Sequence, residues 1–326
     1  MNKRNVILRT EHLDVRFPLK KDTIFSKQRY VHAVSDVSLD IFQGETFGLV
    51  GESGCGKSTF ANATLGFIEP TAGSILFDGE ALDMNNKQKF HQMRMRMQKI
   101  FQDPATSINP RFTVEQTIAE PMRIRKLYSP DEQTELVMDM LRKVGLSESD
   151  RSRYVTEFSG GQQQRIAIAR ALILKPDYLV CDEPVSALDV SVHAQILNLL
   201  MDLQDQLGVT YLFISHNLAA VRKLCSRLAI MYLGRVVEYG NADKIFENPK
   251  HPYTKALISA VLDMKIDSKE KRIMLKGDVA SPIDPLGGCR FASRCPVARE
   301  DCETLSCELK EMEEDHFVSC PYSELS

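Results

Sequence analysis

The first quarter of the chain alternates apolar and polar positions with the period of two that is typical of β-strands. This alternation covers residues 6–17 and 31–42, and a short apolar run, Phe47–Val50, follows the second segment. A turn, a strand and another turn are expected at 66–79. The charged, irregular stretch 18–29 predicts an exposed insertion between the first two strands.

The middle of the chain changes to a helical period. Residues 113–125 and 131–144 predict two helices within a helical subdomain that runs from about 104 to 158. Methionine and arginine alternate over 93–97, and we expect them on a helix that packs its methionines on one side. Buried strands and apolar helices then alternate, which predicts an α/β fold, with strands at 100–101, 178–181 and 210–214 and helices ending at Leu174 and Leu207.

A glycine-rich loop lies between the apolar run at 47–50 and a predicted helix. It has the spacing G-x-x-x-x-G-K-[ST], which turns successive backbone N–H groups towards phosphate oxygens at a helix N-terminus. Lys57 is expected to reach the β- and γ-phosphates, and the Ser58 hydroxyl is expected to bind Mg²⁺. The candidate nucleotide-binding residues of this loop are Gly51, Ser53, Gly54, Cys55, Gly56, Lys57, Ser58 and Thr59.

Carboxylates that suit nucleotide hydrolysis follow the buried strand at 178–181. Asp182 is expected to hold the Mg²⁺ shell, and Glu183 to orient or deprotonate a water molecule. Ser159 and two glycines open the apolar helix before this strand and form a second anion site. His216 follows the strand at 210–214, where it is placed to hydrogen-bond a γ-phosphate.

The identity of a base-stacking aromatic is less constrained. Phe17 is the first candidate and Tyr30 the second, because each lies at the end of a predicted strand segment beside the irregular insertion. An ordinary strand aromatic is the alternative for both.

Composition describes an ordinary globular protein. The 326 residues have 43% hydrophobic content and a net charge of −3, which argues against a polybasic nucleic-acid binder. No signal-peptide core follows Met1, and no stretch approaches the ~20 apolar residues that span a bilayer. If the protein works at a membrane, other subunits must hold it there.

Five of the eight cysteines lie in the last 38 residues. In a chain that is not secreted, such a cluster favours metal or iron–sulfur ligation over disulfides. Thiolates suit iron–sulfur clusters and zinc. Free or redox-active thiols are the remaining interpretation.

The ordered set of motifs resembles the ATP-binding subunit of an ABC transporter. The discriminating piece is Ser159-Gly160-Gly161-Gln162, since many NTPases share the phosphate loop. The resemblance covers residues 6–245 and implies a P-loop NTPase core with a β-subdomain and a helical subdomain. It implies Gln102 as the Q-loop residue near Mg²⁺, Glu183 as the catalytic base and His216 as the switch histidine. It also implies that Ser159, Gly161 and Gln162 contact ATP held by an opposite subunit.

The tail resembles the oligopeptide/dipeptide/nickel importers in the segments 247–257 and 288–296. The resemblance implies a domain division into an ABC ATP-binding domain at 1–245 and a small cysteine-rich C-terminal extension at 246–326. It also implies a [4Fe–4S] cluster on this extension, with Cys307 as a fifth candidate beside the matching positions Cys289, Cys295, Cys302 and Cys320.

The function that the resemblance implies is ATP hydrolysis coupled to import of peptides or a related small solute. Its partners would be two transmembrane permease subunits, a second homologous ATPase subunit in a heterodimer, and an extracytoplasmic solute-binding protein. The chain would be peripheral, on the cytoplasmic face of the inner membrane, with ATP and Mg²⁺ as ligands and no nucleic-acid partner.

Two rival functions carry different expectations. A soluble ABC ATPase acting on DNA or ribosomes usually has two cassettes or a long coiled-coil insertion, and this chain has neither. A redox or iron sensor in the cysteine tail could coexist with transport. Two departures from the family pattern are Cys55, expected to expose an oxidisable thiol, and Asn217, expected to change little.

Overall fold

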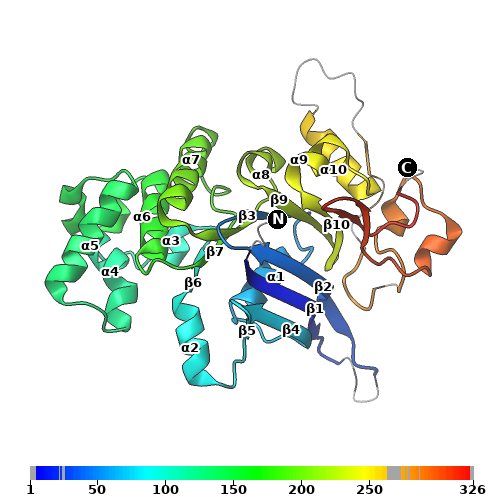
Figure 1. The fold of residues 1–326 in the computed structure, drawn as a ribbon, viewed down its shortest axis with the longest axis horizontal. Coiled ribbons are helices and arrows are strands. Elements are labelled where there is room, and N and C mark those ends of the chain that lie inside the picture. Colours follow the sequence, from blue (N-terminus) through cyan, green and yellow to red (C-terminus); the bar gives the residue numbers. More distant parts are fainter. Residues whose placement is uncertain are drawn as a thin grey trace. The chain divides into compact units, whose positions relative to one another are not determined.

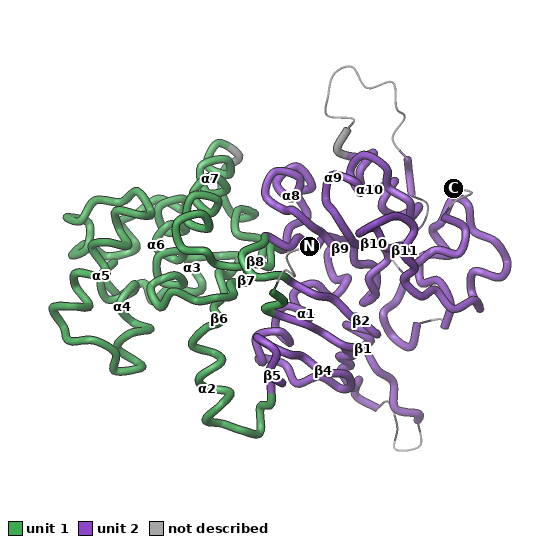
Figure 2. The backbone as a smooth tube through the Cα atoms, in the orientation of Figure 1, with its two compact units in different colours: residues 1–7, 42–45, 83–213 green, residues 8–41, 46–82, 214–326 purple. Residues whose placement is uncertain are grey.

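The computed structural model describes residues 5–323 except 22, 24–25, 263–272, 276, 278–279 and 286. The chain forms two compact units, each assembled from separate chain segments (Figure 2). Unit 1 comprises residues 1–7, 42–45 and 83–213, and unit 2 comprises 8–41, 46–82 and 214–326.

Unit 2 contains an antiparallel sheet made from the alternating segments near the N-terminus. β1 lies between β2 and β4 in this sheet, and Leu8 of β1 faces Phe77 of β4 in the register. Most apolar positions in the middle of both long strands are buried, and most of the polar positions between them face outward. The strand predictions at 6–17 and 31–42 are therefore confirmed. The strands are β2 (Tyr30–Phe42), β1 (Val6–Pro18), β4 (Ala72–Phe77) and β5 (Glu80–Ala81).

The strands of unit 2 that belong to the second sheet include β3, which the phosphate loop follows. The order is β11–β12–β10–β9–β3, with β3 parallel to β9 and the other neighbours antiparallel. All five residues of β3 are buried, as the apolar run predicted. The strands are β3 (Thr46–Val50), β9 (Arg227–Tyr232), β10 (Arg235–Asn241), β11 (Lys310–Glu313) and β12 (His316–Val318).

The helices of unit 2 connect or follow its strands along the chain (Figure 1). Those before the C-terminal segment are α1 (Lys57–Thr64), α8 (Leu218–Leu224), α9 (Ala242–Glu247) and α10 (Pro252–Leu262). Two short 3-10 helices, η3 (Ala292–Arg294) and η4 (Glu300–Glu303), carry the cysteine-rich segment.

Unit 1 is built around the apolar helix α6 (Gly160–Leu172), which packs against β6, α3, α4, α5 and α7. Its strands lie in the order β8–β7–β6, with β6 and β7 parallel. These strands are β6 (Met97–Ile100), β7 (Tyr178–Asp182) and β8 (Thr210–Ile214). The helices around them are α2 (Lys87–Met95), α3 (Pro104–Ser107), α4 (Val114–Ile124), α5 (Pro130–Lys143), η1 (Glu148–Ser152), η2 (Val155–Glu157) and α7 (Val190–Leu207).

The helical predictions hold except at one junction. Helices α4 and α5 match 113–125 and 131–144, because reciprocal capping boxes at Thr113/Gln116 and Ser129/Glu132 fix their first turns. The prediction that 93–97 lies on one helix is wrong: α2 ends at Met95, and Met97 begins β6. Met97 is buried because it pairs with the buried strand β7. Of the helices described, none is long and apolar enough to cross a membrane.

Candidate functional site

The phosphate loop curls between β3 and α1 and leaves no room for side chains at two of its glycines. A Cβ at Gly51 would lie 2.2 Å from the Met231 carbonyl oxygen. A Cβ at Gly56 would lie 2.0 Å from the Ala33 carbonyl oxygen, and Gly56 has a φ of +110°. Both contacts are with backbone, which cannot move aside as a side chain can. The motif glycines are therefore required by the packing of this unit.

Lys57 is turned into the loop. Its ammonium group donates to the carbonyl oxygens of Gly51 at 2.8 Å and Glu52 at 2.9 Å, and the side chain is buried. Ser53, Gly54 and Ser58 are exposed. The loop thus presents its backbone and Ser58 outward while it holds its lysine at the centre, an arrangement that suits an anionic phosphate chain.

The expectation of an exposed thiol at Cys55 is wrong. Cys55 is 3% exposed, and burial raises the pKa of its thiol. Its backbone carbonyl accepts a hydrogen bond from Gly234 at 2.7 Å, which holds the residue against the loop after β9. A buried, protonated thiol is a poor target for oxidants.

The carboxylates of unit 1 lie at the end of β7 beside the glutamine that follows β6. Gln102 Nε2 donates to Glu183 Oε2 at 3.3 Å. Glu183 has a φ of +48°, in the left-handed region that a non-glycine residue rarely adopts. Nine other non-glycine residues in the described part of the chain also have a positive φ, so the catalytic assignment of Glu183 stays a prediction.

Asp182 is held by a lysine that the sequence gave no reason to single out. Lys99 Nζ lies 2.8 Å from Asp182 Oδ2, and the two side chains are 7% and 12% exposed. Since β6 and β7 run parallel and in register, Lys99 is opposite Val180, two residues before Asp182. The sequence signal is a cation in the short strand that pairs with the carboxylate strand.

The motif Ser159-Gly160-Gly161-Gln162 caps the N-terminus of α6. The Ser159 hydroxyl accepts the Gln162 N–H at 3.4 Å, and the Gln162 side chain accepts the Ser159 N–H at 3.0 Å. Ser159 and Gln162 are exposed. A Cβ at Gly161 would lie 2.6 Å from Val192 Cγ1 on α7, so glycine lets the two helices approach. The motif is therefore a helix end that is fixed by its own capping side chains and carries exposed polar residues.

The remaining candidates lie in unit 2. His216 is exposed one residue after the buried Ser215 that follows β8, and Asn217 caps α8 by accepting from the N–H groups of Ala219 and Ala220. Phe17 and Tyr30 are 41% and 38% exposed, so each is partly accessible for stacking. Their solvent exposure does not discriminate between the two candidates.

The five C-terminal cysteines lie close enough to influence one another, and all are free thiols. The Cys289 thiol is hydrogen-bonded to Cys307, and this bond together with burial raises the pKa of Cys289 to about 12. Burial also raises the pKa of Cys295 and of Cys320. Among the residues that the structure describes, no group of three or more His, Cys, Asp or Glu side chains is arranged to hold a metal ion.

The predicted [4Fe–4S] ligation by Cys289, Cys295, Cys302 and Cys320 is therefore not supported. Cluster ligation requires thiolates that converge on one centre. Here the Cys289 thiol is hydrogen-bonded to Cys307, and the Cys302 sulfur accepts the Arg299 N–H at 3.4 Å.

Two family models match the chain. The model described as "ABC transporter" matches residues 34–186, and "Oligopeptide/dipeptide transporter, C-terminal region" matches residues 237–302. Among curated relatives, the oligopeptide transport ATP-binding protein OppF of Haemophilus influenzae is 45% identical over 98% of both chains. AppF of Bacillus subtilis, also an oligopeptide transport ATP-binding protein, is 44% identical over 97% of both.

Solved structures agree. The chain is similar to cbiO1 of Clostridium perfringens, part of the ABC transporter complex cbiONQ, with a TM-score of 0.66 and 27% identity over 80% of this chain and 96% of that one. It is also similar to a dimeric ATP-binding cassette bound to ADP and phosphate after hydrolysis, with a TM-score of 0.63 and 25% identity over 72% and 98% of the two chains. The chain has the ABC ATPase fold and belongs to the ABC transporter family, among the ATP-binding proteins of its oligopeptide/dipeptide group.

Proposed function

We propose that this chain is the ATP-hydrolysing subunit of an ABC importer for peptides, either oligopeptides or dipeptides, or for a related small solute. The observation that carries the proposal is the contact between Gln102 and Glu183 at the end of β7, in a chain whose phosphate loop is complete. The printed names of its relatives, which describe oligopeptide transport, indicate the class of solute.

The proposed chemistry assigns one role to each of the motif residues. The backbone of residues 51–59 and Lys57 bind the phosphates of ATP, and Phe17 or Tyr30 stacks on the base. Ser58, Gln102 and Asp182 would hold Mg²⁺ through their oxygens, the hard donors that this ion prefers, and the ion would neutralise charge on the phosphates. Glu183 accepts a proton from the attacking water, and His216 hydrogen-bonds the γ-phosphate.

The proposed assembly follows from the exposed motif at the start of α6. Ser159, Gly161 and Gln162 close a nucleotide site on a second ATPase subunit, so that ATP joins the two and hydrolysis releases them. We propose a different, homologous chain as that second subunit. Two permease subunits and an extracytoplasmic binding protein complete the complex, which places this chain on the cytoplasmic face of the inner membrane.

The proposal contains no step through an iron–sulfur cluster. The expectation rests on the resemblance of the tail alone, and the arrangement of the thiols gives it no support. Iron and sulfide analysis of protein purified without oxygen tests it directly. Stoichiometric iron and sulfide that are lost in Cys289→Ser and Cys295→Ser would show that the protein binds a cluster through these cysteines.

The decisive experiment is Glu183→Gln in the assembled transporter. The amide cannot accept a proton, so we expect hydrolysis at this subunit's site to fall by about 10²-fold or more while ATP binding and the ATP-bound dimer persist. Glu135→Gln on the exposed face of α5 is the matched control and should leave turnover unchanged. Unchanged hydrolysis at this site in Glu183→Gln would contradict the assignment of the base.

A further inference from the structure

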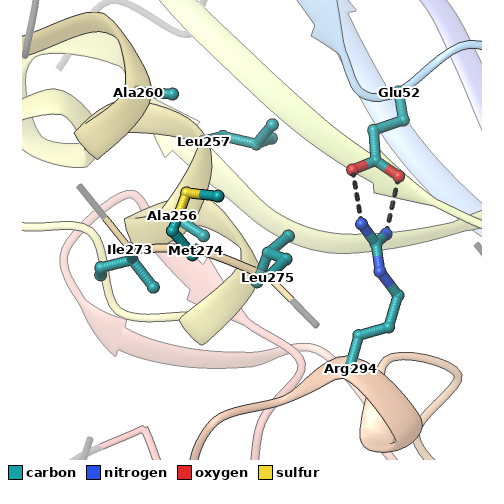
Figure 3. Close-up of a pocket in the computed structure, with 8 residues that line it drawn as sticks. All are labelled: Glu52, Ala256, Leu257, Ala260, Ile273, Met274, Leu275 and Arg294. Atoms are coloured by element: carbon teal, nitrogen blue, oxygen red, sulfur yellow. Dashed lines mark hydrogen bonds and ion pairs between the residues drawn. The ribbon is translucent and has the colours of Figure 1, made fainter. Parts of the chain in front are cut away.

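A residue of the C-terminal extension contacts the phosphate loop within unit 2. Arg294, the last residue of η3, lies 242 positions after Glu52, the second residue of the loop. Its Nη1 donates to Glu52 Oε2 at 2.8 Å, and its Nη2 donates to Glu52 Oε1 at 3.3 Å. Figure 3 shows the guanidinium group and the carboxylate facing each other across these two parallel contacts.

The pair is partly buried. The Arg294 side chain is 9% exposed and that of Glu52 is 26% exposed. The guanidinium carbon lies 5.9 Å from the centre of the Tyr232 ring. The pair also borders a cavity of about 260 Å³ whose other walls are apolar side chains of α10 and of residues 273–275 (Figure 3). A bidentate pair in such surroundings is stronger and better oriented than an exposed ion pair.

Every polar group of Glu52 is engaged. Its backbone N–H donates to the Tyr253 hydroxyl at 3.0 Å, and its carbonyl accepts from Lys57 Nζ at 2.9 Å. The carboxylate is held by Arg294. The residue is thus fixed from two points of the C-terminal region, and it in turn positions the carbonyl on which Lys57 rests.

The residues that contact Glu52 are anchored to a buried aromatic cluster. The rings of Tyr232, Tyr253 and Phe291 contact one another with centroids 4.8 to 5.4 Å apart, and each ring is at most 1% exposed. Phe291 lies directly before η3, and Tyr253 lies in the first turn of α10. The aromatic cluster therefore limits the movement of both contacts to the loop.

We propose that Arg294 is a positioning residue for the nucleotide, by which the C-terminal extension completes the ATP site. This inference rests on the proposed function. A carboxylate in the phosphate loop repels the polyphosphate of ATP unless it is neutralised and held in place. Arg294 does both, so that the loop is ordered before ATP arrives and less binding energy is spent on ordering it.

The test is equilibrium ATP binding to the full chain, together with KM and kcat of the assembled transporter. In Arg294→Gln we expect the Kd and KM for ATP to rise on the order of tenfold, within the usual range of site coupling, with kcat within about twofold. The Kd of Arg294→Lys for ATP should lie between those of the unmutated chain and Arg294→Gln, since an ammonium group keeps the charge but cannot make the bidentate contact. Glu52→Gln in the Arg294→Gln background should restore most of the affinity, because the unpaired carboxylate is removed.

The matched control is Arg9→Gln, which breaks an equally bidentate pair with Asp40, at 2.7 and 2.8 Å, in the same unit. It should leave the Kd for ATP unchanged. A Kd in Arg294→Gln equal to that of the unmutated chain would overturn the inference. So would a loss of affinity that Glu52→Gln fails to relieve and that follows a fall in melting temperature, since Arg294 would then be merely structural. Failure of the unmutated chain to bind ATP would instead refute the proposed function.

Discussion

Glu238 is the residue whose loss should cost the most stability in unit 2. It lies in β10 and is fully buried, with His316 of β12 at 2.7 Å from its Oε1. Its two carboxylate oxygens also accept the backbone N–H groups of Lys250 and His251, each at 2.8 Å. One carboxylate therefore joins the strand, the segment before α10 and the last strand of the chain.

The expected magnitude follows from these contacts. Glu238→Ala removes three hydrogen bonds to the carboxylate, each worth about 1.5–3 kcal/mol when charge-assisted, and leaves two N–H groups and His316 buried without this partner. Breaking a buried pair by removing one partner costs about 3–5 kcal/mol, and we expect a loss in that range. Glu238→Gln keeps one acceptor oxygen, so that one N–H group remains paired, and should cost about 1–3 kcal/mol.

Two measurements check this prediction. In chemical unfolding, the unmutated chain should be the most stable, Glu238→Gln less stable and Glu238→Ala the least stable. The control Glu300→Ala, at an exposed position, should change the free energy of unfolding by less than about 0.5 kcal/mol. Native-state hydrogen exchange should accelerate most at the amides of Lys250 and His251. If Glu238→Ala unfolds at the same denaturant concentration as the unmutated chain, the carboxylate does not hold the extension.

Two further predictions concern the loop and a surface histidine. Gly56→Ala should abolish ATP binding and lower the melting temperature, because its Cβ meets the Ala33 carbonyl oxygen. Gly54→Ala, with nothing within 4 Å of its Cβ, should pay only the backbone strain of about 1–2 kcal/mol; equal effects of the two would contradict this reasoning. The hydrogen bond from His12 Nδ1 to Asp36, at 2.7 Å, raises the pKa of His12. The folded pKa thus exceeds the unfolded one, and the small stabilisation is complete below the unfolded pKa of about 6.5 and lost as pH rises through the folded pKa. In Asp36→Asn, NMR titration should find a lower pKa for His12; an unchanged value would assign the shift to another group.

The elements that the sequence predicted well are those whose signals are local. Alternation identified β1 and β2, and the helical period located α4 and α5. The phosphate loop followed from its spacing because its glycines are fixed by contact with nearby backbone. At Met93–Met97 the same alternation suited a helix and a strand equally, and only pairing with β7 decided where the helix ended.

The contacts that the sequence could not predict join residues far apart along the chain. Nothing near Lys99 indicated Asp182 as its partner, and Cys55 looked accessible because its motif faces phosphate, although its side chain points into the core. Clustered cysteines predicted proximity correctly, but their spacing does not determine which sulfurs converge.

Glu52 shows why such contacts matter for function. The phosphate-loop pattern leaves this position open to any residue, so a motif search treats it as neutral. In this unit it is the point where Tyr253 and Arg294, from the C-terminal region, meet the lysine that the motif requires. A binding loop made of backbone N–H groups has few side chains through which another part of the chain can hold it. The Glu52 carboxylate provides such a side chain. Its negative charge must be neutralised near the phosphates, and Arg294 supplies the compensating positive charge.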